Sequence, residues 1–548
     1  MSAPVVLVHP PQAKACEPPS GLPALAGHLM RQGVPVRLVD ANLRVQEALL
    51  SEASLATGAQ RLRDTLGPGP AATSARRAAA RAEAVLEALR RPATYADPGE
   101  HRRALARLAE AYRAASRARG VRISPSDLEV PGWSPLSARD LIEAARQPER
   151  TGLGPELEGA AAEILRSDPA LVGVSATFLS QALPSFALAG LLRRAGFRGR
   201  LVLGGGLVGS WAGRLRPDSP IFRIWDALVA GPGEEALAGL AAGRPPPALP
   251  GVMAPGAGAW LPRGTGARPA VCFRPSFDGL PWSRYWAPGP ILPLATSRGC
   301  YWRRCAFCPE AAQDGQPFRM ASPEELADTL ARSPGGPAPW AHLTDDAVPP
   351  RMLRQLARAD AGARWYGFAR LEKAFLDPGF ARELAGGGCA MLQLGVESAS
   401  QRLLDAMGKG TRVAEAEAIL AHLAAAGIRT YVYLLFGLPS ETPAEAEHTL
   451  AWAARNAASI TFLNLSLFHR PRGSRLDPRP AAGHAPCARP EDEDRDLSLY
   501  WGHPEGERSR RRALRTLLRD ARNDPVLGPI LARTPEGLTS NHAAFAPL

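Results

Sequence analysis

Long hydrophobic runs and lysine are the most obvious absences from this chain of 548 residues. No run of about 18 or more apolar residues occurs, so the sequence predicts no membrane-spanning helix and no membrane partner. The opening residues, MSAPVVLVHPPQ, lack the basic segment and long apolar core of a secretory signal. They predict a buried strand instead, and we expect a cytoplasmic protein.

Lysine occurs only at positions 14, 373 and 409, so arginine supplies 62 of the 65 basic residues. The net charge of +12 raises the question of a nucleic-acid partner. The arginines, however, alternate with acidic residues, as in the run from Arg76 to Arg119, and form no basic block with interleaved aromatics. This dispersal favours solvated helix faces and argues against a nucleic-acid surface.

Cysteine is also sparse, with seven residues at positions 16, 272, 300, 305, 308, 389 and 487. That number and scatter do not indicate the disulfide framework of a small secreted domain. Three cysteines nevertheless fall within nine residues, in TSRGCYWRRCAFCP (296–309). Three thiolates on one short loop can hold three irons of a cubane cluster and leave the fourth iron open. A structural zinc site is the alternative, and the lack of a second cysteine pair weighs against it.

The first half of the chain predicts an α/β domain over residues 1–242. Short apolar runs alternate with helical segments, a pattern typical of a doubly wound, Rossmann-like or flavodoxin-like parallel sheet. A helical insertion is expected at about 43–165, with helices near 73–91 and 101–119. The strands are predicted at 5–9, 34–40, 171–178, 201–206 and 226–233.

The second half predicts a different α/β unit. Residues 243–289 are rich in Pro and Gly and predict a linker with a few short strands. Six strand–helix repeats over 290–475 then predict a partial (β/α)6 barrel, two repeats short of a complete one. A C-terminal extension, 476–548, is expected to be partly helical, near 505–522. The barrel strands are predicted at 291–297, 341–346, 363–370, 390–398, 430–437 and 460–468.

The triple-cysteine loop resembles the signature of the radical S-adenosylmethionine (SAM) superfamily. The resemblance implies that Cys300, Cys305 and Cys308 bind a 4Fe–4S cluster and that SAM chelates the open iron through its amino and carboxylate groups. Phe307, directly before the last cysteine, also matches the signature. The loop departs from the common pattern by having four residues, instead of three, between the first two cysteines. We interpret that spacing as a subfamily mark.

Four later segments are similar to SAM-contacting segments of the same superfamily. The resemblance implies that the end of the second strand contacts the SAM amino group. It also implies that the fourth strand contacts the ribose and methionyl end of SAM, and that the GLPSET stretch after the fifth strand contacts SAM. Arg370, at the end of the third strand, is expected to pair with the SAM carboxylate. Helix capping is the alternative for the acidic residues. The implied contact residues are Phe307, Asp345, Asp346, Arg370, Glu397, Ser398 and Gly437.

The first domain resembles the cobalamin-binding domain of many radical SAM enzymes. The resemblance rests on Pro10-Pro11, on PPSGL (18–22), on Asp40-x-Asn42 and on the glycine-rich strand ends. The Asp-x-His-x-x-Gly motif that supplies a cobalt ligand in well-known cobalamin modules is absent, and a scaffold domain without cofactor is the alternative. The implied cobalamin contacts are Ser175, Thr177, Gly204, Gly205, Gly206 and Gly231.

Together these resemblances imply reductive cleavage of SAM to a 5′-deoxyadenosyl radical, followed by cobalamin-dependent methyl transfer to an unactivated carbon. The expected partners are a small-molecule or peptide substrate and an electron donor such as flavodoxin or ferredoxin. The alternatives are radical cyclisation, oxidation or rearrangement without methyl transfer, and a non-catalytic metal- or nucleic-acid-binding protein. A methylthiotransferase is disfavoured because Cys16 stands alone in the first domain. No catalytic side chain beyond the cofactor contacts is predicted.

Overall fold

The computed structural model describes residues 3–255, 271–312, 318–331, 340–359, 362–476, 496–502, 505–534 and 538. The chain divides into two compact units. The described parts of unit 1 lie within Met1–Ile291 and Cys487–Ser498, and those of unit 2 within Leu292–Pro486 and Leu499–His542. The predicted fold class is confirmed, because each unit is an α/β structure built on a largely parallel sheet.

Unit 1 has a six-stranded sheet in the order β2-β1-β5-β6-β7-β8. The apolar strand β1 is buried along its whole length and pairs in parallel with β2 on one side and β5 on the other. The strand order therefore reverses at β1, and ligands of doubly wound sheets bind at the carboxyl ends of the strands at such a point. The strands are β1 (Val5–His9), β2 (Val36–Asp40), β5 (Leu171–Ser175), β6 (Arg200–Gly204), β7 (Ala227–Val229) and β8 (Val252–Met253).

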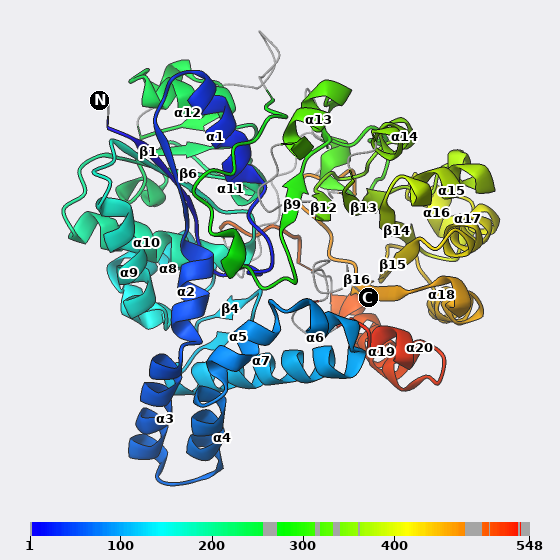
Figure 1. Ribbon diagram of the computed structural model, residues 1–548, viewed down its shortest axis with the longest axis horizontal. Helices are drawn as coiled ribbons and strands as arrows, with labels where there is room; N and C mark the ends of the chain where they lie inside the picture. Colours follow the sequence, from blue (N-terminus) through cyan, green and yellow to red (C-terminus); the bar gives the residue numbers. More distant parts are fainter. Residues whose placement is uncertain are drawn as a thin grey trace. The chain divides into compact units, whose positions relative to one another are not determined.

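Helices cover both faces of this sheet. Helices α1 and α12 contact each other on one face, and α10 packs against α8 and α9 on the other (Figure 1). The antiparallel edge strand β8 comes from the segment predicted as a linker, so part of that segment completes the first sheet. The helices are α1 (Gly21–Arg31), α8 (Ala138–Arg146), α9 (Gly154–Leu165), α10 (Ala182–Arg194), α11 (Gly206–Trp211) and α12 (Glu234–Ala241).

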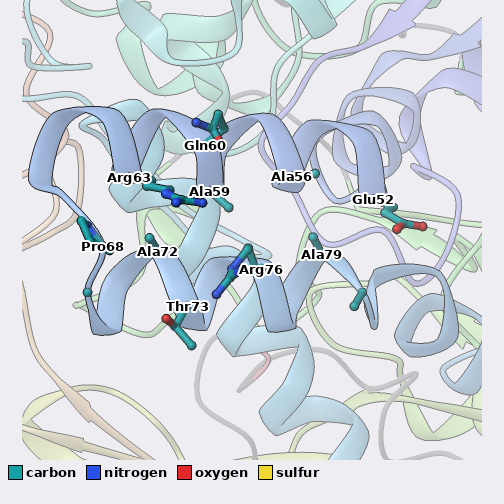
Figure 2. A pocket seen from close by; sticks show the side chains of 12 residues that line it. Glu52, Ala56, Ala59, Gln60, Arg63, Pro68, Ala72, Thr73, Arg76 and Ala79 are labelled. Carbon is teal, nitrogen blue, oxygen red and sulfur yellow. The ribbon is translucent and has the colours of Figure 1, made fainter.

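The predicted insertion is helical and contains one small hairpin, β3–β4. Helices α3 and α4 lie side by side, joined by the turn at Pro68, and both pack on the longer α7 (Figures 1 and 2). A groove of about 530 Å³ runs between α3 and α4, and its lining includes five alanines together with Arg63 and Arg76. None of the predicted cofactor contacts lines this groove. The elements are α2 (Ala41–Leu49), α3 (Glu52–Leu66), α4 (Pro70–Ala79), α5 (Ala82–Ala88), α6 (Pro92–Ala96), α7 (Pro98–Arg119), β3 (Arg122–Ile123) and β4 (Leu128–Glu129).

Unit 2 has a second six-stranded sheet whose strands follow one another in chain order, β9-β12-β13-β14-β15-β16. Neighbouring strands from β12 to β16 are parallel, as the six strand–helix repeats predict. Helices α15 and α17 pack on β14 and β15. The strands are β9 (Ile291–Leu294), β12 (Trp340–Leu343), β13 (Arg364–Ala369), β14 (Cys389–Glu397), β15 (Arg429–Phe436) and β16 (Phe462–Leu467).

Several helices of unit 2 begin with a side-chain N-cap, as α15, α16 and α18 do. Helix α18 starts with a capping box, in which Thr442 and Glu445 satisfy each other's backbone N–H groups. Among the described helices of the chain, none is both long and apolar enough to cross a membrane. The helices are α13 (Pro323–Ala331), α14 (Pro350–Arg358), α15 (Pro378–Gly386), α16 (Gln401–Ala406), α17 (Val413–Ala425), α18 (Pro443–Arg455), α19 (Glu505–Asp520) and α20 (Leu527–Leu531).

Candidate functional site

The triple-cysteine loop leaves the carboxyl end of β9, the first strand of the second sheet. Two short antiparallel strands, β10 (Ser297–Arg298) and β11 (Arg319–Met320), close the base of the loop. The thiols of Cys300, Cys305 and Cys308 are free of disulfide bonds; Cys305 is buried, and the other two are half-buried. The loop therefore presents three available sulfur ligands at the edge where parallel barrels carry their active sites.

The loop docks on a turn that is about a hundred residues further along the chain. The indole N–H of Trp302 donates to the carbonyl of Gly408 at 2.9 Å, and the backbone N–H of Ala306 donates to the carbonyl of Met407 at 2.7 Å. Gly410 has a φ of +71°, and a Cβ added to it would lie 2.2 Å from the Trp302 ring. Glycine is therefore required at position 410 by both backbone conformation and space.

Lys409, in the same turn, forms a buried ion pair. Its Nζ lies 2.7 Å from Oε1 of Glu397, and both side chains are largely buried. The pair crosses over Gly395, where an added Cβ would lie 2.3 Å from the Glu397 carboxylate. Glu397 itself has a φ of +69°, at an irregularity in the pairing of β14 with β15. The irregularity in strand pairing and the small residue at Gly395 thus allow the side chain of Glu397 to point toward Lys409.

Two cations face the thiol of Cys305. Nη1 of Arg370 lies 3.7 Å from its Sγ, and Lys409 is the other positive group near it. Burial raises the pKa of the Cys305 thiol, and the charges of Lys409 and Arg370 oppose that shift. A thiolate at this position is therefore stabilised by two neighbouring positive charges.

Arg370 is held by its surroundings on several sides. Its Nε lies 3.1 Å from Glu372, one of its terminal nitrogens donates to the carbonyl of Lys409, and its guanidinium lies 4.2 Å above the ring of Trp302. Glu372 also accepts a hydrogen bond from the hydroxyl of Tyr301 at 2.9 Å. Arg370 therefore links the end of the third strand to the cysteine loop. The sequence prediction for Arg370 named only a pairing with the SAM carboxylate.

The two adjacent aspartates at the end of β12 differ in their surroundings. Asp345 is buried and accepts hydrogen bonds from the backbone N–H and hydroxyl of Thr296 and from the hydroxyl of Ser297. Burial raises the pKa of Asp345, and these hydrogen bonds oppose the shift. Asp345 thus anchors the start of the cysteine loop. Asp346 is exposed, and helix α14 begins later, with Pro349 at its N-cap position.

The remaining predicted SAM contacts have structural partners as well. Ser398 is buried, and its hydroxyl accepts from the backbone N–H of Ser400, which in turn caps α16. Phe307 packs against an apolar cluster that anchors the end of the loop, formed by Leu403, Leu404, Met407, Leu438 and Phe468. Gly437 has a φ of +83° and donates its N–H to Glu441. These three residues therefore shape the strand ends around the loop.

The predicted cobalamin contacts lie together at the carboxyl edge of the first sheet. Ser175 pairs with Gly204 across β5 and β6, and the Ser175 hydroxyl lies 3.6 Å from a Cβ placed on Gly21 at the start of α1. Gly205 has a φ of +95°, Gly231 a φ of +82°, and a Cβ on Gly206 would meet only Thr177, at 3.8 Å. Next to them, the ring of Phe178 is 54% exposed. This edge offers glycine backbone, hydroxyls and one apolar ring.

Neutral amides hold the loop that follows β1. Gln181 donates to the carbonyl of Pro10 at 2.6 Å and accepts from the N–H groups of Thr177 and Phe178. Asn42 accepts from the backbone N–H of Ala13 at 2.9 Å, and Gln46 donates to both of them. His9, at the end of β1, is buried, which lowers its pKa and keeps the ring neutral. The first edge is thus preorganised largely by neutral amides, together with the buried Asp40 at the end of β2, which accepts a hydrogen bond from the hydroxyl of Tyr285.

The two edges differ in what they can hold. No group of three or more His, Cys, Asp and Glu side chains close enough to bind a single metal ion occurs within the described ranges. The three thiols on one loop, flanked by Arg370 and Lys409, fit an iron–sulfur cluster, whose irons are bound by separate cysteines. The glycine-lined edge of the first sheet fits a large ligand that approaches the backbone closely.

Several residues of the site were not predicted from the sequence. Trp302, Glu372 and Lys409 all contact the loop or its partners, and none was named as a candidate. Two signals were available for Lys409: it is one of three lysines in an arginine-rich chain, and it lies between two glycines. Nothing in the sequence pattern indicated the contact between Trp302 and the turn.

Comparison with known proteins supports the architecture. Residues 294–453 match the model of the Radical SAM superfamily. The structure of a radical SAM methyltransferase, TsrM, from Kitasatospora setae, with cobalamin and a [4Fe–4S] cluster bound, superposes with a TM-score of 0.50 and 18% identity. The match covers 87% of this chain and 74% of that one. At this identity the likeness establishes the fold.

Sequence relatives match a smaller part of the chain. An uncharacterized methyltransferase of Pyrococcus horikoshii is 28% identical over 193 residues, which is 33% of this chain and 40% of the relative. The tryptophan 2-C-methyltransferase of Streptomyces laurentii is 27% identical over 177 residues, which is 29% of each chain. The chain thus matches less than half the length of these relatives.

Proposed function

We propose that this protein is a radical SAM enzyme whose cluster is bound by Cys300, Cys305 and Cys308; residues 294–453 match the model of the Radical SAM superfamily. The observation that carries the proposal is the docked cysteine loop, with two cations at Cys305 and three thiols outside any disulfide bond. When bound, a 4Fe–4S cluster with SAM on its open iron supplies the electron that cleaves SAM and yields a 5′-deoxyadenosyl radical.

The chain's own residues hold the loop and set its charge. Asp345 fixes the base of the loop through Thr296 and Ser297, while Trp302 fixes its middle on the Gly408 carbonyl. Arg370 and Lys409 stabilise the thiolate form of Cys305 and offset the negative charge of a bound cluster. Asp346 and Glu397 remain proposed contacts for the amino group and ribose of SAM.

We further propose that unit 1 binds cobalamin and that the reaction is a methyl transfer to an unactivated carbon. The proposal is supported by the glycine-lined edge at Gly204, Gly205 and Gly206, by the hydroxyls of Ser175 and Thr177, and by the likeness of fold to a methyltransferase that binds cobalamin. Cobalamin supplies a transferable methyl group. The residues of unit 1 supply a surface for it whose loops are held by neutral amides, and the sequence lacks the Asp-x-His-x-x-Gly motif that would supply a cobalt ligand.

The substrate is proposed to be a small molecule or a peptide, and the electron donor a flavodoxin or ferredoxin. A cytoplasmic location suits a site with three cysteines that form no disulfide bond, because thiols stay reduced in that compartment.

The cluster is tested by anaerobic reconstitution with iron and sulfide. We expect the cluster's visible absorbance, and release of 5′-deoxyadenosine on reduction with SAM. Replacing Cys300, Cys305 and Cys308 together by Ala should abolish both. Cys389→Ala, a buried cysteine on β14, is the matched control and should retain both. Absorbance that persists in the triple variant would contradict the cluster assignment.

Methyl transfer is tested separately, with hydroxocobalamin in the reconstitution and SAM labelled on its methyl group. A candidate substrate should gain one labelled methyl group, and retained cobalamin should be visible in the spectrum after desalting. Release of 5′-deoxyadenosine with a product of unchanged carbon count would instead indicate cyclisation, oxidation or rearrangement.

A further inference from the structure

Gln393, in the middle of β14, has no hydrogen-bond partner among the described residues. Its side chain is fully buried, and neither its Oε1 nor its Nε2 finds a donor or acceptor. Buried amides in folded proteins are almost always paired, so an orphaned one calls for an explanation. A primary amide offers one acceptor and two donors side by side, which suits a ligand with the complementary pair.

The register of the sheet places Gln393 in a row of aromatic side chains. Phe368 on β13 and Tyr431 on β15 are its direct partners across the strands. Side chains alternate between the two faces of a sheet, so the neighbours Leu392 and Leu394 point to the other face, which is wholly buried. Gln393 therefore shares its face with aromatic rings, whereas the opposite face is aliphatic.

Tyr433, two residues beyond Tyr431, extends this face toward the carboxyl ends of the strands. Its ring centroid lies 5.3 Å from that of Phe368 and 4.6 Å from that of Tyr431. Phe368 and Tyr433 are both half-buried, as is Asn464, the strand partner of Tyr433. The layer beyond Gln393, toward the strand ends, is thus lined by side chains that are partly exposed. Arg370 follows Phe368 two residues later, so the same face continues to the cysteine loop.

We propose that this face binds the substrate and that the substrate is a planar aromatic or heteroaromatic molecule with an adjacent N–H donor and carbonyl acceptor, as in a lactam or an amide-bearing ring. The ring stacks on Phe368 and Tyr433, and its polar edge pairs with Gln393. This inference rests on the proposed function, because it specifies the substrate of that reaction.

The probe for this site is 2-quinolone, a flat ring with adjacent N–H and C=O groups, compared with N-methyl-2-quinolone, which has lost the donor. Dissociation constants are measured by calorimetry on the anaerobically reconstituted full chain with SAM and without reductant. We expect 2-quinolone to bind about tenfold or more tightly than its N-methyl analogue, because a site built to pair with an N–H group rejects a ligand lacking one.

Gln393→Met, which keeps the length of the side chain but removes the amide, should bring the ratio of the two constants to about one. Gln355→Leu on α14 is the matched control and should keep the wild-type ratio. Tyr433→Leu should weaken the binding of both probes equally and keep the ratio of their dissociation constants. This variant tests the stacking surface if Gln393→Met does not fold.

A ratio of the two dissociation constants near one in the wild-type protein would overturn the inference, and so would a wild-type ratio in Gln393→Met. The inference would also fail if Tyr433→Leu bound both probes as tightly as the wild-type protein does. Cluster absorbance and 5′-deoxyadenosine release are recorded in the same preparations. Their absence would count against the proposed radical SAM function, whereas a failed ratio in an active preparation would count against the substrate class alone.

Discussion

The two sheets of this protein end in edges of opposite chemical character. At the edge of the second sheet, Arg370, Glu397 and Lys409 form a buried set of charges around the thiol of Cys305. At the edge of the first sheet, neutral amides hold the loops, and the buried Asp40 accepts hydrogen bonds from a backbone N–H and from the hydroxyl of Tyr285. Both edges follow the same parallel-strand rule, so the difference lies in the loops. The fold determines where a ligand site can form, and the loop residues determine which chemistry that site supports.

The comparison also separates two kinds of energetic cost. Buried charges depend on one another, because each loses its hydration and is compensated only by its partner. Buried neutral amides need hydrogen bonds, but losing one partner strands no charge. The charged edge is therefore expected to be the more fragile of the two under single substitutions, and the predictions below are ordered accordingly.

The largest effect is expected for Lys409→Met. This change leaves Glu397 buried without its partner, and should lower the free energy of unfolding of unit 2 by about 3–5 kcal/mol. Denaturant unfolding of the anaerobic protein measures it. Arg402→Ala is the control, because Arg402 pairs with Glu445 at an exposed site and should cost less than about 1 kcal/mol. Equal losses of unfolding free energy in the two variants would show that the buried ion pair is no more fragile than the exposed one.

A smaller effect is expected for Gly410→Ala. The new Cβ would collide with the ring of Trp302, and φ at this position is +71°, so we expect a loss of about 1–3 kcal/mol and a lower iron content. Gly206→Ala at the other edge has room and should change stability by less than about 0.5 kcal/mol. Trp302→Leu combined with Gly410→Ala should recover part of the stability. If Gly206→Ala lowers the free energy of unfolding more than Gly410→Ala does, the edge of the first sheet is the more fragile of the two.

One buried histidine of unit 1, His101 on α7, predicts sensitivity to acid. Burial lowers the pKa of His101 from 6.5 to about 4. Between these values the unfolded chain binds a proton that the native chain does not, so stability falls as the pH falls from 6.5 toward 4. The slope from this group is at most about 1.4 kcal/mol per pH unit.

His101→Phe should flatten that slope in unfolding curves measured across this pH range. His9 contributes a residual slope of the same sign, since burial lowers its pKa as well. His448→Gln, at an exposed position on α18, should leave the slope unchanged. A wild-type slope in His101→Phe would show that the acid sensitivity has another source.

The smallest effect on stability is expected for Phe178→Ala. The ring is 54% exposed, so the change in the free energy of unfolding should be within about 0.5 kcal/mol. Cobalamin retained after desalting should nevertheless fall, because the ring borders the proposed cobalamin surface. Leu66→Ala, at the exposed end of α3, is the control and should leave retention unchanged. Full retention in Phe178→Ala would indicate that cobalamin does not contact this ring.

Much of the fold could be predicted because short apolar runs and amphipathic segments report directly on local structure. The six barrel strands lie where their apolar runs predict them, as β1, β2, β5, β6 and β7 do in the first sheet. The pairing of β8, only two residues long, carried no comparable signal.

The site could be predicted only in part, because a residue type at a strand end does not reveal its partner. Asp345 was predicted as a SAM contact, and in the structure it binds Thr296 and Ser297. The alternative of helix capping by Asp346 is wrong, since α14 has Pro349 at its N-cap position and no side-chain cap, whereas Ser400 caps α16. Lys409 was missed because its role depends on Glu397 and on the docking of Trp302, contacts that tertiary folding creates.

The docking of the cysteine loop also sets an order of events during synthesis. Trp302 bonds to the carbonyl of Gly408, which is 106 residues further along the chain. At about 5–20 residues per second, the ribosome needs about 5–20 s to make that stretch. Throughout this interval Cys300, Cys305 and Cys308 already exist, but the turn that holds their loop does not. Metal loading into the native loop geometry is therefore a late event, which follows synthesis of the fourth strand–helix repeat.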